Sequence, residues 1–258
     1  LNKFLVIKKI RKFGFLSKGF VYVTIGILTL LTALKLGGKV SDKNGVITFL
    51  ENQIFGKILL IIVGFGMFSY AIWRFYKSYF VIKKEEKKTK YLLSIDYFIR
   101  GIVYGSFAIS VLFKAFNQSK NGISKESAVA KILQLETGKY ILYAIAIIIF
   151  FSAINQFYIV YKNIFLENVE KSKNITSFSF LEKTGKFGIT ARGISFLIFS
   201  WFIFKATSDK NPSKIKGTQE MFSYLQNLSF GSFLMGIMAL GFISYGVFQY
   251  FYGRYSSY

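Results

Sequence analysis

The sequence predicts an all-helical integral membrane protein with six transmembrane helices, arranged as three tandem two-helix repeats. Hydrophobic residues make up 53% of the 258 residues and aromatic residues 19%, which exceeds the usual composition of soluble domains. Runs such as residues 141–151 have no polar face, whereas a soluble amphipathic helix would have one. The composition and the pattern together indicate a bilayer as the solvent.

Six segments contain the roughly 20 mostly apolar residues that a spanning helix needs. They are residues 15–34, 58–76, 97–116, 140–161, 187–204 and 232–252. The basic stretch before the first segment resembles a signal peptide, but the apolar run is long and five more spans follow it. We therefore expect a retained first helix and a single membrane domain over residues 1–258.

Charge predicts the orientation of these helices. The larger share of the 34 Lys and Arg residues lies in the N-terminal segment, the second-to-third and fourth-to-fifth connections and the C-terminus. The positive-inside rule then places both termini in the cytoplasm. Heavy use of Ile, Lys, Phe, Asn and Tyr resembles an AT-rich bacterial genome, so we expect the bacterial inner membrane. The surplus of Lys in the mixed-charge connection at residues 83–88 favours anionic lipids at the cytoplasmic face over nucleic acid as partners.

An internal repeat is the most informative feature of the sequence. A basic residue and a glycine open each odd-numbered helix: Lys18-Gly19, Arg100-Gly101 and Arg192-Gly193. A second glycine opens each even-numbered helix 37, 37 and 38 residues later: Gly56, Gly138 and Gly231. Eighteen residues further on lie Arg74, Gln156 and Gln249, without a gap in any copy. The repeats span approximately residues 12–80, 93–165 and 185–254.

Each repeat contains two spans, so successive repeats enter the membrane in the same direction. Parallel repeats of this kind can be related by a pseudo-threefold axis along the membrane normal. Segments 46–50, 127–133 and 221–225 between the two helices of each repeat have helical patterns of their own. We expect short amphipathic connector helices on the outer membrane surface, with irregular loops as the alternative.

These residues resemble the bacterial membrane family called domain of unknown function 1206. Phe13-Gly14 with Lys18-Gly19-Phe-Val-Tyr22 carries the resemblance in the first helix, and Phe55-Gly56 with Tyr70-Ala-Ile-Trp-Arg74 carries it in the second. The later repeats depart from the pattern: Thr137 replaces the phenylalanine, and Gln156 and Gln249 replace the arginine. The resemblance covers essentially the whole chain and implies an architecture without an established activity.

Six repeated polar positions form the candidate site. Lys18, Arg74, Arg100, Gln156, Arg192 and Gln249 are all expected near the cytoplasmic membrane boundary, one pair per repeat. Long cationic side chains at that depth can snorkel to water and fix the depth of a helix. Alternatively, they form a ring that binds anionic lipid headgroups or another anion. Both interpretations remain open at the level of sequence.

Glycine and aromatic positions have simpler interpretations. Gly19, Gly56, Gly101, Gly138, Gly193 and Gly231 are predicted to pack helices closely. The aromatic residues Tyr22, Tyr70, Trp73, Tyr76, Tyr104, Tyr245 and Tyr250 are predicted to form an interfacial belt.

The chain contains neither cysteine nor histidine and no recognisable catalytic or phosphate-binding motif. We therefore expect no enzyme activity, no cofactor and no metal site. The leading hypothesis is an accessory or scaffold subunit or a lipid-associated module, which could also bind other membrane proteins. The alternative is a small-solute or ion transporter or channel with a pathway along the pseudo-threefold axis. No span carries a central carboxylate, which coupled carriers usually require.

Overall fold

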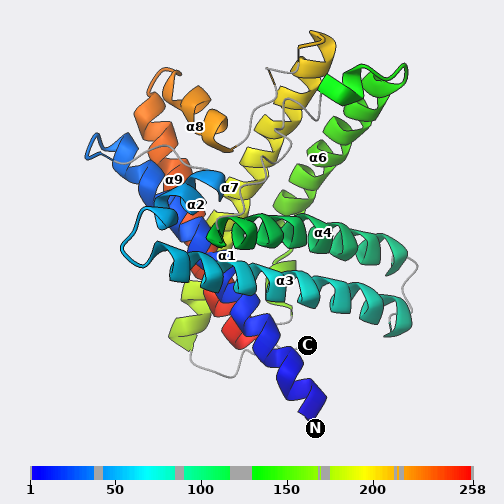
Figure 1. The fold of residues 1–258 in the computed structure, drawn as a ribbon, viewed down its shortest axis with the longest axis vertical. Coiled ribbons are helices and arrows are strands. Elements are labelled where there is room, and N and C mark those ends of the chain that lie inside the picture. The colour runs from blue at the N-terminus through cyan, green and yellow to red at the C-terminus, as the bar shows by residue number, and fades with distance from the viewer. Residues whose placement is uncertain are drawn as a thin grey trace. The chain divides into compact units, whose positions relative to one another are not determined.

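The computed structural model describes residues 2–37, 43–84, 90–116, 130–167, 169, 175–211, 214 and 218–256. Every regular element within these residues is a helix (Figure 1). The helices are α1 (Asn2–Ala33), α2 (Lys43–Glu51), α3 (Gly56–Lys84), α4 (Lys90–Ala115), α6 (Gly138–Tyr161), η1 (Ile164–Leu166), α7 (Ile175–Ser208), α8 (Thr218–Gln226) and α9 (Gly231–Tyr255). A helix satisfies its backbone hydrogen bonds internally, as a lipid environment demands.

Among the described residues, six helices are long and apolar enough to cross a membrane, so the chain is a multi-pass membrane protein. The candidate spans are Leu5–Ala33, Gly56–Lys83, Leu93–Ala115, Gly138–Tyr161, Phe178–Ser208 and Gly231–Tyr255. Several helices extend beyond the predicted segments, most clearly α1, which begins at Asn2. Hydropathy marks the lipid-immersed part of a helix, whereas the flanking Lys and Arg are themselves good helix formers and continue it.

The chain forms two compact units. Unit 1 contains Leu1–Val21, Ile47–Lys120 and Gln249–Ser256, and unit 2 contains Tyr22–Val46, Asn121–Phe248 and Ser257–Tyr258.

In unit 1, α3 and α4 lie side by side (Figure 1). Ser78 of α3 and Ser94 of α4 join the two helices, with their hydroxyl oxygens 2.8 Å apart. Each hydroxyl also lies within hydrogen-bond distance of the other residue's backbone carbonyl, at 2.9 and 3.1 Å. Both serines are buried, so this reciprocal pair is a polar link between membrane helices.

In unit 2, α6 and α7 lie side by side (Figure 1). Leu142 of α6 and Ala206 of α7 are buried together in one apolar cluster, and Ser200 donates a hydrogen bond to the carbonyl of Ala146 at 2.9 Å. Helix α7 also meets α9 through small residues, since a Cβ on Gly241 would overlap the methyl group of Ala191. Small residues at such crossings let helix backbones approach closely.

Short helices α2 and α8 occupy the connections of the first and third repeats, where the sequence predicted helical patterns. Val46, Ile47 and Leu50 of α2 are buried, as are Met221, Phe222 and Leu225 of α8. Their apolar faces therefore contact protein. In the second repeat, residues 130–133 are helical, and the rest of the predicted 127–133 segment lies outside the described residues.

The same backbone turn precedes each even-numbered helix of the repeat. The amide of Gly56 donates to the carbonyl of Gln53 at 2.8 Å, and the equivalent bonds join Gly138 to Leu135 at 2.9 Å and Gly231 to Leu228 at 2.8 Å. A Cβ on any of these three glycines would collide with a carbonyl at the end of the preceding connection: Glu51, Ile132 or Gln226. These glycines permit a tight turn into the helix, which is a different role from the predicted helix–helix packing.

Candidate functional site

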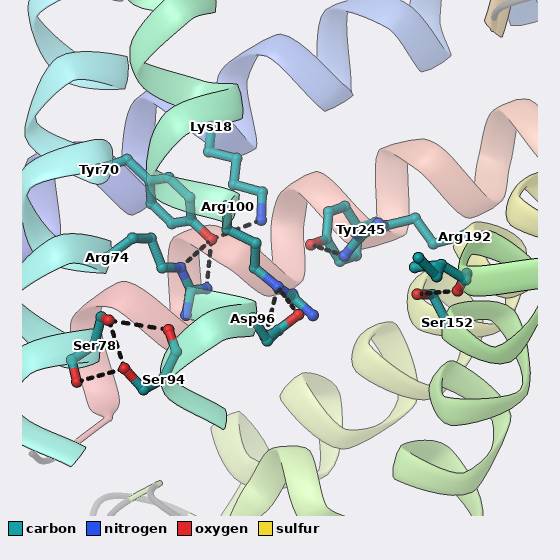
Figure 2. A network of polar contacts seen from close by, with 11 residues as sticks. Lys18, Tyr70, Arg74, Ser78, Ser94, Asp96, Arg100, Ser152, Arg192 and Tyr245 are labelled. Atoms are coloured by element: carbon teal, nitrogen blue, oxygen red, sulfur yellow. Dashed lines mark hydrogen bonds and ion pairs between the residues drawn. The ribbon is translucent and has the colours of Figure 1, made fainter. Parts of the chain in front are cut away.

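Two cations of the first repeat meet at one tyrosine hydroxyl. Lys18 of α1 donates a hydrogen bond from Nζ to the Tyr70 hydroxyl of α3 at 3.0 Å, and Arg74 donates from Nε to the same oxygen at 2.8 Å (Figure 2). A second guanidinium nitrogen of Arg74 also contacts that oxygen. Tyr70 is 0% exposed and Lys18 1% exposed, while Arg74 is partly exposed. Lys18 therefore does not snorkel to the surface of its unit.

The local sequence explains why these groups meet. Tyr70 and Arg74 are four residues apart on α3, so they share one helix face. Lys18 lies one turn after Gly14 on α1. A Cβ on Gly14 would be only 2.5 Å from the backbone nitrogen of Tyr70. The absence of a side chain at Gly14 lets the two helices touch at the tyrosine, and Lys18 then reaches the hydroxyl.

Aromatic rings surround the two cations. Lys18 Nζ lies 4.7 Å from the Tyr70 ring centroid and 5.0 Å from that of Tyr104. The Arg74 guanidinium carbon lies 5.4 Å from the ring of Tyr97 and 5.8 Å from that of Phe15. Ring faces attract cations at these distances, so the rings offset part of the cost of burying positive charge.

Two like charges lie close together in this cluster. Each donor nitrogen is about 3 Å from the same oxygen, so the two cations lie within about 6 Å of each other. At that separation and an effective dielectric constant of about 20, two unit charges repel by on the order of 3 kcal/mol. The phenol oxygen of Tyr70 accepts hydrogen bonds from both cations. No carboxylate among the described residues forms an ion pair with Arg74.

The third repeat contains the same arrangement with one cation fewer. Arg192 of α7 donates from Nη1 to the Tyr245 hydroxyl of α9 at 2.6 Å (Figure 2). Gly188, one turn before Arg192, lies so close to α9 that a Cβ would overlap the backbone of Tyr245. Gln249 occupies the position equivalent to Arg74 and is 4% exposed. Its buried side-chain oxygen accepts no hydrogen bond from the described residues.

The second repeat has lost this arrangement. Asp96 occupies the position of Gly14 and Gly188, and Ser152 that of the tyrosines. Arg100 pairs with Asp96 on its own helix at 2.8 Å, and Ser152 donates to the carbonyl of Ile148 (Figure 2). Asp96 thus neutralises Arg100, the cation at this position of the second repeat.

The family is decided by comparison with known proteins. A family model described as Domain of Unknown Function (DUF1206) matches the chain three times, at residues 13–81, 95–162 and 187–256. The chain belongs to this family. The uncharacterized protein YxxB of Bacillus subtilis (strain 168) is 28% identical over 256 residues, which cover 96% of this chain and 91% of YxxB. No solved structure matches the chain. The resemblance predicted from the glycine and tyrosine anchors is confirmed, and three DUF1206 repeats account for the six helices.

The six predicted site positions of this DUF1206 chain therefore differ from one another. The structure brings Lys18 and Arg74 together, gives Arg192 a tyrosine partner and gives Arg100 a carboxylate partner. Gln156 and Gln249 are buried. Tyr70, Tyr245 and Asp96 were not predicted to be polar partners of these residues. Their spacing was the available signal, since each precedes a site residue by one helical turn: Arg74, Gln249 and Arg100, respectively.

The predicted aromatic belt is wrong for five of its seven members. Tyr22, Tyr70, Trp73, Tyr104 and Tyr245 are at most 8% exposed. They pack against each other and against cations: the Tyr70 and Tyr104 rings lie 4.8 Å apart, and so do those of Tyr22 and Tyr245. Tyr250, in contrast, is 41% exposed. Attraction between cations and ring faces favours the buried position of Tyr70, Tyr104 and Tyr245, whose ring centroids lie 4.7, 5.0 and 4.8 Å from Lys18 or Arg192.

The remaining predicted glycines lie on helix faces. Gly101 contacts the ring of Phe75, Gly193 contacts the ring of Phe157, and Gly19 is buried. In the described part of the chain, no group of three or more His, Cys, Asp and Glu side chains is placed to hold a metal ion.

Proposed function

We propose that this DUF1206 protein is a non-enzymatic, lipid-associated module of the bacterial inner membrane, with both termini in the cytoplasm. The observation that carries the proposal is the pair of cations at Tyr70, which share one hydroxyl oxygen among aromatic rings. Two cations this close together match the anionic headgroups of a bacterial membrane.

The depth of the cluster supports this proposal. At about 1.5 Å per residue, Lys18 lies about 22 Å along α1 from Ala33, and Arg74 lies about 27 Å along α3 from Gly56. A hydrocarbon core is about 30 Å thick. Both cations then belong in the inner third of the bilayer, close to the phosphate layer of the cytoplasmic leaflet.

The proposal includes a pseudo-threefold arrangement of the repeats with connector helices on the outer side. Two equivalent contacts support it. Tyr70 of the first repeat meets Tyr104 of the second, and Tyr245 of the third repeat meets Tyr22 of the first, each at 4.8 Å. In both contacts the even-numbered helix of one repeat meets the odd-numbered helix of the next, and the third repeat returns to the first, as cyclic order requires.

Gentle purification of the full chain, followed by native mass spectrometry and lipid extraction, tests the proposed function. We expect anionic phospholipid to remain bound, alone or together with a protein partner. Purified protein that retains neither would overturn the proposal. So would anion flux through reconstituted vesicles that is lost in Arg100→Ala and Arg192→Ala variants, because that result would establish the solute path considered as the alternative.

A further inference from the structure

We propose that Lys18, Tyr70 and Arg74 form a binding site for one phosphate-bearing anion per chain, and that the equivalent positions of the other two repeats do not. This inference rests on the proposed lipid association and deepens it by naming the ligand class and the residues that hold it.

In repeat 1, two cations, Lys18 and Arg74, donate hydrogen bonds to the same tyrosine hydroxyl. In repeat 3 the neutral Gln249 replaces Arg74, and in repeat 2 Gln156 replaces it while Asp96 neutralises Arg100. The three repeats thus share one helix pattern but differ in the charge at the equivalent positions. The proposed site therefore lies in the first repeat alone.

Arg74 is the group that a ligand would meet first. It is partly exposed, whereas Lys18 and Tyr70 lie behind it in the buried interface of α1 and α3. Among the described residues, Arg74 donates hydrogen bonds to Tyr70 from Nε and one terminal nitrogen, which leaves donors of its other terminal nitrogen for a ligand.

A phosphate group matches this geometry better than a single carboxylate does. The two cations come from different helices and flank one oxygen within about 6 Å of each other. A tetrahedral phosphate offers several oxygens in different directions, so it can accept more than one hydrogen bond from the planar guanidinium of Arg74, while the buried ammonium of Lys18 adds positive charge from behind. A phospholipid headgroup and free inorganic phosphate share this chemistry.

The test uses the full-length protein in detergent and lipid nanodiscs. One arm measures binding of phosphatidylglycerol against phosphatidylcholine by native mass spectrometry, and the other measures the thermal shift produced by inorganic phosphate. Arg74→Gln is the informative variant, because glutamine already occupies that position in repeats 2 and 3. Arg254→Gln is the matched control, since it removes an exposed arginine that lies 3.4 Å from the Tyr250 hydroxyl.

We expect one tightly bound anion per wild-type chain, with affinity reduced about ten- to hundredfold in Arg74→Gln and little changed in Arg254→Gln. Arg74→Lys should give an intermediate affinity, because lysine keeps the positive charge but lacks the planar guanidinium that can donate two parallel hydrogen bonds. Binding of phosphatidylglycerol alone identifies a headgroup site, and a phosphate-induced shift lost in Arg74→Gln identifies a site for free phosphate.

The proposed site would be overturned if the wild type and Arg74→Gln bound the anion equally well. It would also be overturned if Arg74→Gln and Arg254→Gln lost anion affinity to the same extent. The two proposals fail separately. If Arg74→Gln retains the same lipid as the wild type, the lipid association stands and the site is wrong. If the wild type binds inorganic phosphate and retains no lipid, the site stands and the lipid association is wrong.

Discussion

Gly14 of α1 lies directly against the backbone of Tyr70 in α3, so that a Cβ on Gly14 would be 2.5 Å from the tyrosine nitrogen and 2.6 Å from its Cα. The equivalent residues of the third repeat, Gly188 and Tyr245, touch in the same way. In both repeats the basic residue one turn after the glycine donates to the tyrosine hydroxyl. Where the glycine is replaced by Asp96, the tyrosine is replaced as well, by Ser152. The glycine, the tyrosine and the basic residue therefore occur together: the glycine permits the close helix contact, and the basic residue then reaches the tyrosine hydroxyl.

Gly14→Ala should destabilise the protein by about 1–3 kcal/mol, because the new methyl group meets backbone that cannot rotate away. The matched control is Gly105→Ala in α4, where a Cβ would lie 3.6 Å from the methyl group of Ala71. That change should be neutral or stabilising by up to about 1 kcal/mol, because alanine favours helix over glycine. Unfolding in mixed detergent micelles measures both. Equal effects at the two glycines would contradict the close contact.

Tyr70→Phe should cost about 2–4 kcal/mol, because two buried or partly buried cations lose their shared acceptor. Tyr250→Phe is the control: Tyr250 is 41% exposed, and its hydroxyl receives a long 3.4 Å hydrogen bond from Arg254. Its loss should stay within about 0.5 kcal/mol. Thermal unfolding of the two variants in the same detergent measures the difference. A Tyr70→Phe variant as stable as wild type would mean that the hydroxyl does not hold the cations.

Ser78→Cys combined with Ser94→Cys should form a disulfide, because the two hydroxyl oxygens lie 2.8 Å apart and a disulfide needs side chains in direct contact. The chain has no cysteine of its own, so the background is clean. Mass spectrometry of maleimide adducts should find two reactive thiols before mild oxidation and none afterwards. Ser78→Cys with Ser110→Cys, four to five turns further along α4, should keep both thiols free. Oxidation of the control pair to the same extent would argue against the α3–α4 register.

Single cysteines also test the orientation predicted from charge. Lys83→Cys, near the end of α3, should be protected from a membrane-impermeant maleimide in cells with an intact inner membrane. Ser208→Cys, at the end of α7, should react. Both side chains are exposed, so burial does not limit labelling. The reverse pattern would place the termini outside the cytoplasm.

The sequence predicted the elements of this fold better than their polar contacts. Apolar runs between Lys-rich connections mark six helices, and the glycine anchors at 19, 101 and 193 mark three repeats. Neither signal reveals that Tyr70 is buried, because a tyrosine near the end of an apolar run is equally consistent with an interfacial position. The glycine spacing likewise does not distinguish Gly101, which contacts a neighbouring helix, from Gly56, which forms a turn.

The sequence by itself determined that this is a DUF1206 membrane protein with six long apolar segments, three repeats and a basic residue at the same place in each. Hydropathy and periodicity are properties of the chain alone, so they are readable without a fold. Only the tertiary structure decided which of those basic residues share a partner, because that depends on how closely two helix backbones approach. Gly14 permits the close approach of α1 and α3 that brings Lys18, Tyr70 and Arg74 into contact. Arg100 instead forms its ion pair with Asp96 of the same helix.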